Sequence, residues 1–104
     1  MREVTDNTFR QEIENKNLIL VDFYATWCGP CKMQADVLEK INTSRSLKFD
    51  IIKVNVDESP KLAMEYEIES IPTLMVFKNN NLVKKIVGYV DEERLLNLME
   101  EFED

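Results

Sequence analysis

The residues best suited to chemistry are the two cysteines, which stand together in WCGPCK, residues 27–32. The chain has no other cysteine and no histidine. If a helix begins here, a spacing of three places both sulfurs on one face about 5 to 6 Å apart, which permits a disulfide. The free N–H groups and positive dipole end of that helix would also lower the pKa of the Cys28 thiol. The pair is therefore a candidate redox centre with Cys28 as the nucleophile.

Three other interpretations of the pair stay open. A zinc site usually takes four ligands, so two cysteines without histidine fit one poorly unless two chains share the metal. A structural disulfide would close a very short loop and would stabilise the fold little. The cysteines could also be incidental buried thiols. Redox chemistry ranks above all three, because CxxC beside a β-α-β pattern favours it.

The residues around the pair predict the elements that position it. LILVDFYA, residues 18–25, is a continuous apolar run typical of a strand covered on both faces. Gly29 allows another backbone to approach closely, and Pro30 suits the first turn of a helix. The apolar residues that follow fall on one helical stripe: Met33, Val37, Leu38 and Ile41.

The middle of the chain continues the alternation of strand and helix. FDIIKVNV, residues 49–56, predicts a second central strand. Ser59 as N-cap and Pro60 at the first helical position then predict another helix. An earlier helix is expected within residues 5–16, with Thr5 or Asp6 as its cap and with Phe9 and Ile13 facing inward. This alternation predicts parallel strands joined by helical crossovers.

The last third of the chain predicts a hairpin followed by a helix. TLMVFK and LVKKIVG, residues 73–78 and 82–88, are strand-like and are joined by the asparagines at 79–81, which tolerate left-handed backbone angles. The sheet is therefore expected to be mixed. Asp91 caps a final helix with apolar residues at helical spacing: Leu95, Leu98, Met99 and Phe102.

Composition limits the class of protein. A chain of 104 residues suits one domain, residues 1–104, and 44% hydrophobic with 32% charged residues is typical of globular proteins. The net charge of -7 would repel nucleic acid and anionic lipid. No apolar run has the length of a signal peptide or a membrane span, so we expect a cytoplasmic protein. Nothing indicates an obligate dimer, and a monomer is expected.

WCGPCK after VDFYAT resembles the active-site segment of the thioredoxin family, and the similarity covers essentially the whole chain. VDFYATWCGPCKM, KVNVDESP, SIPTLMVFKN and VGYV occur in the family's order and approximate spacing. The resemblance implies an α/β thioredoxin fold, in which about four helices flank a central mixed sheet of about five strands. It also implies a general protein-disulfide reductase that takes part in cell redox homeostasis.

The resemblance gives roles to four further residues. Asp22 matches the carboxylate that accepts or donates the proton of the second cysteine, and its place in an apolar strand independently predicts burial and a raised pKa. Lys53 matches the charged partner of Asp22, although a half-exposed strand lysine is an alternative interpretation. Pro72 matches the family's cis-proline, next to which Ile71 would offer backbone groups to a substrate strand.

The resemblance also implies an apolar rim that contacts partner proteins. Its residues are Trp27, Val56, Ile71, Pro72, Val87, Gly88 and Tyr89. From the pattern alone the valines are as typical of a core. The chain departs from the family pattern where Asp36 replaces a helix proline, Ser70 a glycine, Tyr24 a tryptophan and Asn80 a hairpin glycine. Asp36 predicts that the long helix has no proline kink.

The implied reaction is dithiol–disulfide exchange. The Cys28 thiolate attacks a partner disulfide, and Cys31, deprotonated with help from Asp22, then attacks the Cys28 sulfur and releases the reduced partner. No bound metal or organic cofactor is implied, and electrons return from NADPH through a flavin-dependent thioredoxin reductase. Gly29 and Pro30 tune the reduction potential and favour a reductase over an oxidase or isomerase of the same fold.

A binding module is the alternative from another class. A domain of this fold can serve as a docking subunit, with its thiols secondary. The last segment, residues 91–104, has seven acidic residues to one basic and could form such a contact surface. A run of this kind is more often a solvated helix face.

Overall fold

The computed structural model describes all 104 residues as a five-stranded mixed sheet with four helices. The elements in chain order are β1 (Arg2–Glu3), α1 (Phe9–Glu14), β2 (Leu18–Tyr24), α2 (Gly29–Ser44), β3 (Asp50–Asn55), α3 (Pro60–Glu65), β4 (Thr73–Lys78), β5 (Asn81–Val87) and α4 (Glu92–Glu100). The strand order is β1-β3-β2-β4-β5. The central strand β2 pairs parallel with β3 and antiparallel with β4.

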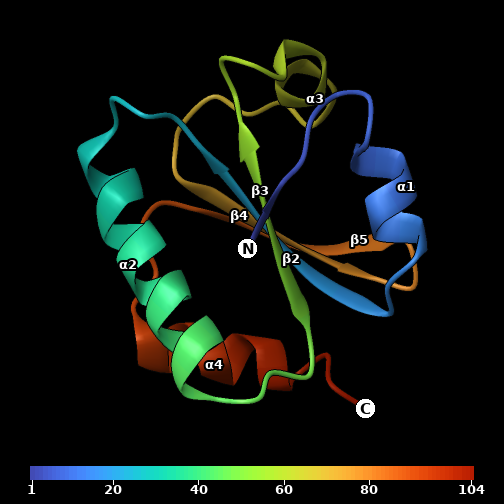
Figure 1. Cartoon of the computed structure of the whole chain (residues 1–104), viewed down its shortest axis with the longest axis vertical. Coiled ribbons are helices and arrows are strands. Elements are labelled where there is room, and N and C mark those ends of the chain that lie inside the picture. The colour runs from blue at the N-terminus through green and yellow to red at the C-terminus, as the bar shows by residue number, and fades with distance from the viewer.

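The helices cover both faces of the sheet, with α2 and α4 on one side and α1 and α3 on the other (Figure 1). Because successive strand residues point to opposite faces, each of the central strands β2, β3 and β4 supplies both cores. The strand residues in the core beside α2 and α4 are Leu18, Leu20, Ile51, Leu74 and Val76. Those beside α1 and α3 are Ile19, Val21, Phe23, Ile52, Val54, Met75 and Phe77. This two-sided burial explains the continuous apolar run in β2.

The stripe predicted for α2 is wrong at its first member. Met33 is 55% exposed, and the buried residues of the helix are Cys31, Gln34, Leu38 and Ile41. Since Cys31 faces inward, helical periodicity turns residues three, seven and ten positions later inward and turns Met33 away. The helix runs without interruption through Asp36.

The predicted caps are partly confirmed. Asp91 accepts a hydrogen bond from the Arg94 N–H at the start of α4, as predicted. The cap predicted for α1 is wrong, because that helix begins at Phe9 with Thr8 in the N-cap position. Asp6 instead caps α3, where its carboxylate accepts from the backbone N–H groups that begin that helix.

The hairpin is confirmed with a shorter turn. Asn79 and Asn80 connect β4 to β5 with φ angles of 49° and 71°, whereas Asn81 already begins β5. These left-handed angles are ones that asparagine adopts more readily than most residues. The sequence did not place β1, because its two residues are too few for a periodic pattern. No helix is both long and apolar enough to span a membrane.

Candidate active site

The cysteine pair lies where β2 passes into α2. Cys28 is the N-cap of α2, and its sulfur accepts a hydrogen bond of 3.2 Å from the N–H of Cys31. The two cysteines are joined by a disulfide, with their Cα atoms 5.2 Å apart, and both are buried. A helix N-terminus with an N–H directed at sulfur stabilises a thiolate and lowers the pKa of a thiol at this position.

The two residues between the cysteines lie on the surface. Pro30 occupies the first turn of α2, as predicted. The close backbone approach predicted for Gly29 is not found within the chain, because a Cβ added at Gly29 would meet no atom within 4 Å. The space beside Gly29 is open to solvent and to any docking molecule.

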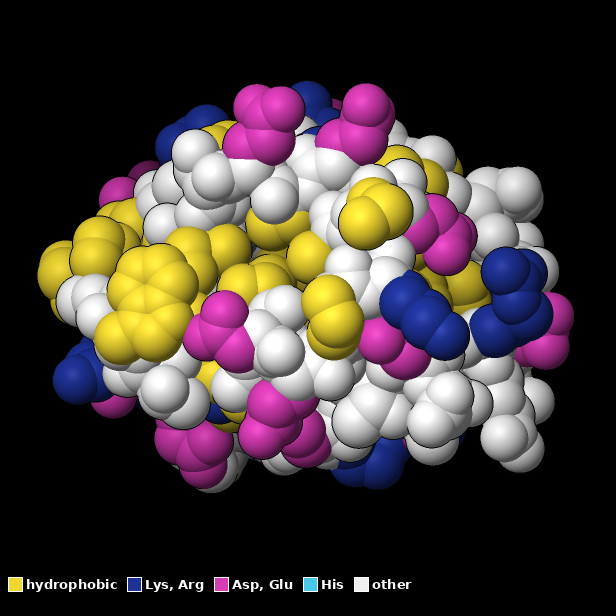
Figure 2. Space-filling model, turned by 90° about the horizontal axis from the view of Figure 1, so that it is seen from above, with side chains coloured by type: hydrophobic (Ala, Val, Ile, Leu, Met, Phe, Trp, Pro, Cys, Tyr) yellow, Lys and Arg dark blue, Asp and Glu magenta, His cyan; other side chains and the backbone are white.

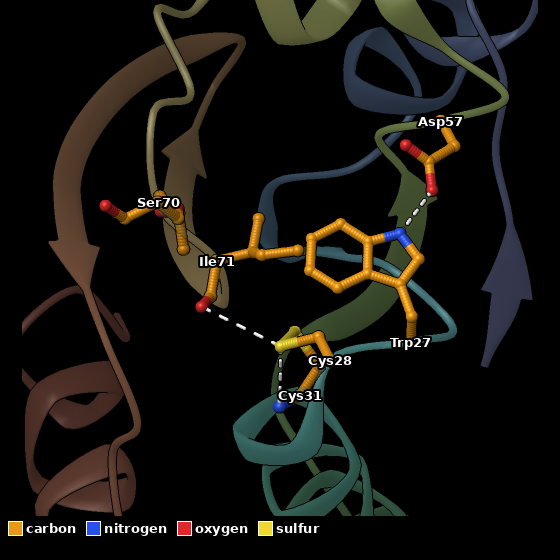
Figure 3. The surroundings of a disulfide bond; sticks show 7 residues. Trp27, Cys28, Cys31, Asp57, Ser70 and Ile71 are labelled. Atoms are coloured by element: carbon orange, nitrogen blue, oxygen red, sulfur yellow. Dashed lines mark hydrogen bonds between the residues drawn. A yellow bond between two sulfur atoms is a disulfide. The ribbon is translucent and has the colours of Figure 1, made fainter.

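The turn before β4 lies across from the cysteines (Figure 3). The Ile71–Pro72 peptide bond is cis, as the resemblance implies. The carbonyl oxygen of Ile71 lies 3.8 Å from the Cys28 sulfur, and the Ile71 side chain packs against the cysteine cluster. The Gly88 N–H donates to the Pro72 carbonyl over 2.8 Å, which ties the end of β5 to this turn.

Apolar groups gather around the cysteine end of the molecule. Figure 2 looks onto this end and shows hydrophobic atoms in a continuous area with acidic side chains on either side. Trp27 is 70% exposed, Val87 60% and Tyr89 39%, whereas Val56 and Ile71 are half-buried. Val87 therefore lies at the surface, whereas Val56 is partly buried and also packs against the core beside α1 and α3.

The carboxylate of Asp22 is buried beneath α2. The residue lies in β2 with no exposed surface, and its position in the alternation directs it to the face that α2 and α4 cover. Neither carboxylate oxygen has a hydrogen-bond partner. Burial raises the pKa of Asp22 to about 7, opposed by the positive charge of Lys53 and reinforced by the negative charge of Glu3.

Lys53 lies beside Asp22 in the pairing of β2 with β3, but it forms no ion pair with the carboxylate. Its ammonium nitrogen lies 4.4 Å from the centre of the Tyr24 ring, a cation–π contact. The Tyr24 hydroxyl donates a 2.6 Å hydrogen bond to Glu3. Lys53 therefore acts on Asp22 through its charge and not through direct contact.

Comparison with known proteins decides the family. The thioredoxin family model matches residues 1–101. The chain belongs to the thioredoxin family. Its sequence is 49% identical over 98 residues to thioredoxin of Staphylococcus epidermidis, covering 94% of this chain and 93% of that protein. Identity to Staphylococcus aureus thioredoxin is 48% over the same shares of both chains.

The solved structures confirm the thioredoxin fold. A mutant thioredoxin from Halobacterium salinarum superposes with a TM-score of 0.90 at 32% identity, covering 99% of this chain and 90% of that one. The chain is accordingly a thiol–disulfide oxidoreductase with disulfide reductase function, and Cys28–Cys31 is its redox pair. This result rules out the zinc-site, structural-disulfide and incidental-thiol interpretations of the cysteine pair.

Sequence reasoning missed a residue that orients Trp27 in this thioredoxin-family site. The Trp27 Nε1–H donates a 2.8 Å hydrogen bond to Asp57, which fixes the ring beside the cysteines (Figure 3). Asp57 follows β3, and Trp27 follows the parallel strand β2. The carboxyl ends of adjacent parallel strands meet at one edge of a sheet, so this pairing could have been anticipated.

A small pocket opens beside the second cysteine. It has a volume of about 200 Å³ and is lined by Tyr24, Ala25, Thr26, Cys31, Lys32, Ala35 and Lys53. Cys31 lines this pocket, although only 3% of its surface is exposed.

Proposed function

We propose that this thioredoxin-family protein is a general reductase of protein disulfides in the cytoplasm, recycled by NADPH through a flavin-dependent thioredoxin reductase. The observation that carries the proposal is the placement of the Cys28 sulfur between the first N–H groups of α2 and an exposed apolar surface. The first feature favours a thiolate, and the second accommodates a protein chain. We expect residues 1–104 to act as one domain and a monomer.

Cys28 performs the first exchange. The Cys31 N–H that donates to its sulfur in the oxidised protein would also stabilise the thiolate of the reduced protein. This thiolate attacks one sulfur of the target disulfide, forming a mixed disulfide, and the other target sulfur leaves as a thiolate. Gly29 and Pro30 set the reduction potential through the geometry of this turn.

Cys31 performs the second exchange with Asp22 as its proton acceptor. A carboxyl with a pKa of about 7 can take up the thiol proton near neutral pH, where an exposed aspartate would be too weak a base. The Cys31 thiolate then attacks the Cys28 sulfur, the intramolecular disulfide forms, and the target leaves with its second thiol. Lys53 adjusts the basicity of Asp22 through its charge.

The rim holds the target while these steps proceed. Ile71 offers its carbonyl oxygen close to the Cys28 sulfur, so a bound strand can pair with this backbone. Trp27 and Tyr89 supply rigid aromatic surface at low cost in conformational entropy. Val56, Pro72, Val87 and Gly88 complete the rim. Because these contacts engage backbone and apolar groups, they suit many targets.

The reduction potential and the recycling assay test this proposal together. Equilibration of Cys28–Cys31 against dithiothreitol should give a strongly reducing value, near the about -270 mV known for thioredoxins, a figure carried over from the family. A bacterial thioredoxin reductase with NADPH should then sustain insulin reduction. A potential near those of oxidases, or no electron transfer from NADPH, would contradict the proposal.

The acidic C-terminal segment gives no independent support to a docking role. Glu92 at the start of α4 is paired within the chain, with Lys40 at 2.9 Å and Arg45 at 3.5 Å. Replacing both cysteines with serine separates the two functions in cells. Loss of function is expected, whereas full function without the thiols would support a docking module.

A further inference from the structure

Gln34 is a polar side chain in the buried stripe of α2. It lies one turn after Cys31, has no exposed surface, and is surrounded on its helix face by apolar neighbours. Both of its amide atoms are hydrogen-bonded. Its Nε2 donates to the Val90 carbonyl oxygen over 3.0 Å, and its Oε1 accepts from the Val90 N–H over 2.8 Å.

The segment that Gln34 holds is the one that carries Tyr89. Residues 88–90 connect the end of β5 to Asp91, the cap of α4, and are not part of either element. Gly88 has a φ of 98°, an angle that gives this segment its direction and that other residues rarely adopt. The segment therefore depends on contacts from outside for its position.

Two anchors fix the segment on either side of Tyr89. The Gly88 N–H donates to the Pro72 carbonyl, beside the residue whose carbonyl faces the Cys28 sulfur. The Val90 N–H and carbonyl are both bonded to Gln34, on the helix that carries both cysteines near its start. Tyr89 lies between these anchors with 39% of its surface exposed.

An apolar side chain at position 34 would fill the same space without holding the segment. Val90 has no exposed surface, so its N–H and carbonyl would lose their partners with no water to replace them. Burying a glutamine amide within an apolar stripe is unfavourable unless each polar atom is bonded, and here each one is. The arrangement joins the redox helix to one edge of the exposed surface.

We propose that Gln34 is a positioning residue for protein substrates: its amide holds residues 88–90 against α2, so that Tyr89 keeps its place relative to Cys28. This inference rests on the proposed role of the rim in binding protein targets. Both hydrogen bonds of Gln34 are to Val90, and none joins it to either sulfur. Its loss therefore weakens the exchange with proteins and spares the exchange with small disulfides.

Gln34→Met is the test, because methionine has a similar length and no strong hydrogen-bonding group. Pre-reduced protein is mixed with insulin or with dithiobis(nitrobenzoate), and the second-order rate constant is measured for each. The constant for insulin should fall about three- to tenfold, as expected for losing one or two hydrogen bonds that order the rim. The constant for the small disulfide and the reduction potential should stay at their original values.

Ile41→Ala is the matched control. Ile41 is buried on the same face of α2, about 10 Å further along the helix axis, and forms no hydrogen bond to residues 88–90. It lowers stability without releasing the segment, so the ratio of the two rate constants should not change. If Ile41→Ala changes the ratio of the insulin and small-disulfide rate constants as much as Gln34→Met does, the effect is explained by lost stability and the proposal is overturned.

Tyr89→Ala separates this inference from the proposal that it rests on. If Tyr89→Ala slows insulin reduction and Gln34→Met does not, the positioning role of Gln34 is wrong, but the proposed role of the rim in binding targets is retained. If Tyr89→Ala does not slow insulin reduction, Tyr89 is not part of the target-binding rim, and the inference about Gln34 is overturned as well. Hydrogen exchange needs no variant: the Val90 amide should be protected, and exchange at the rate of a free amide would also overturn the proposal.

Discussion

The two sides of the sheet are packed by different kinds of side chain. Beside α1 and α3 the buried strand residues are apolar except for Thr73, whose hydroxyl donates to the Ser70 carbonyl oxygen. The rings of Phe9, Tyr66 and Phe77 contact one another on this side with centroids 5.7 to 5.8 Å apart. Beside α2 and α4 the same layer contains two fully buried polar side chains, Asp22 and Gln34.

This difference separates a stabilising side from a reactive side. Apolar burial beside α1 and α3 lowers the free energy of the fold without chemical consequence. A carboxylate with no hydrogen-bond partner does the opposite, because its charged form is poorly solvated. The side that contains Asp22 is also the side from which α2 presents the cysteines. The unpartnered carboxylate of Asp22 therefore lies where the proposed mechanism requires a proton acceptor.

The largest effect is expected from Cys28→Ser on the reactive side. Serine cannot form the mixed disulfide, so reduction of insulin should fall by about three orders of magnitude or more. The far-ultraviolet circular dichroism spectrum should keep its shape, because the cores do not depend on this side chain. Residual activity within tenfold of the original protein would mean that Cys28 is not the nucleophile.

On the stabilising side, Phe9→Ala should act on stability alone. Removing a ring that contacts both Tyr66 and Phe77 should lower the free energy of unfolding by about 3–5 kcal/mol in urea titrations. Reduction of dithiobis(nitrobenzoate) by the folded protein should be unchanged at low temperature. A changed rate would mean that packing beside α1 and α3 also affects the reaction, and would contradict the distinction between the two sides.

Asp22→Asn should raise stability, and the effect should depend on pH. Because the pKa of Asp22 is raised to about 7, the folded oxidised protein binds this proton more tightly than the unfolded chain does. The free energy of unfolding therefore falls as pH rises from about 4 to about 7 and stays low above that window. The variant removes this loss, so it should be more stable by roughly 2–4 kcal/mol at about pH 8 and close to the original at about pH 4.

Asp36→Asn is the control for this comparison, since it removes an exposed carboxylate from the same side of the molecule. Urea titrations of the oxidised proteins at both pH values provide the measurement. A gain for Asp22→Asn that is equal at both pH values, or a similar gain for Asp36→Asn, would show that the buried charge is not the cause.

The smallest effect is expected at the rim. Trp27→Phe keeps an aromatic ring but removes the hydrogen bond to Asp57, so the ring is oriented less firmly beside the cysteines. Because the contact is exposed, insulin reduction should slow about two- to tenfold, the range for one ordinary hydrogen bond. Asp57→Asn, which retains an acceptor oxygen, should have a smaller effect. An effect of Asp57→Asn larger than that of Trp27→Phe would contradict this reading of the contact.

The sequence was most informative where local chemistry and periodicity determine the result. The cysteine spacing, the apolar run of β2 and the cap at Asp91 each depend on neighbouring residues, and each appears as predicted. The fold and the reductase function came from the resemblance and are confirmed by the comparisons.

Contacts between distant segments were not predictable in the same way. Asp6 caps a helix that begins 54 residues later, and Gln34 bonds to a residue 56 positions away. The sequence shows the hydrogen-bonding capacity of these side chains but not the partner that the fold brings to them. Met33 was wrongly predicted to face the core. The inward position of Cys31 determines which face of α2 is buried, and the apolar pattern of the helix did not include that residue.

The most direct test of a reactive side built around Asp22 is the rate at which Cys31 resolves a mixed disulfide on Cys28, followed by stopped flow from about pH 6 to about pH 8. In the original protein this rate should rise with pH through an apparent pKa near that of the buried carboxyl. In Asp22→Asn it should be slower and should lack that inflection, while Asp36→Asn follows the original protein. Superimposable profiles for Asp22→Asn and the original protein would contradict the account.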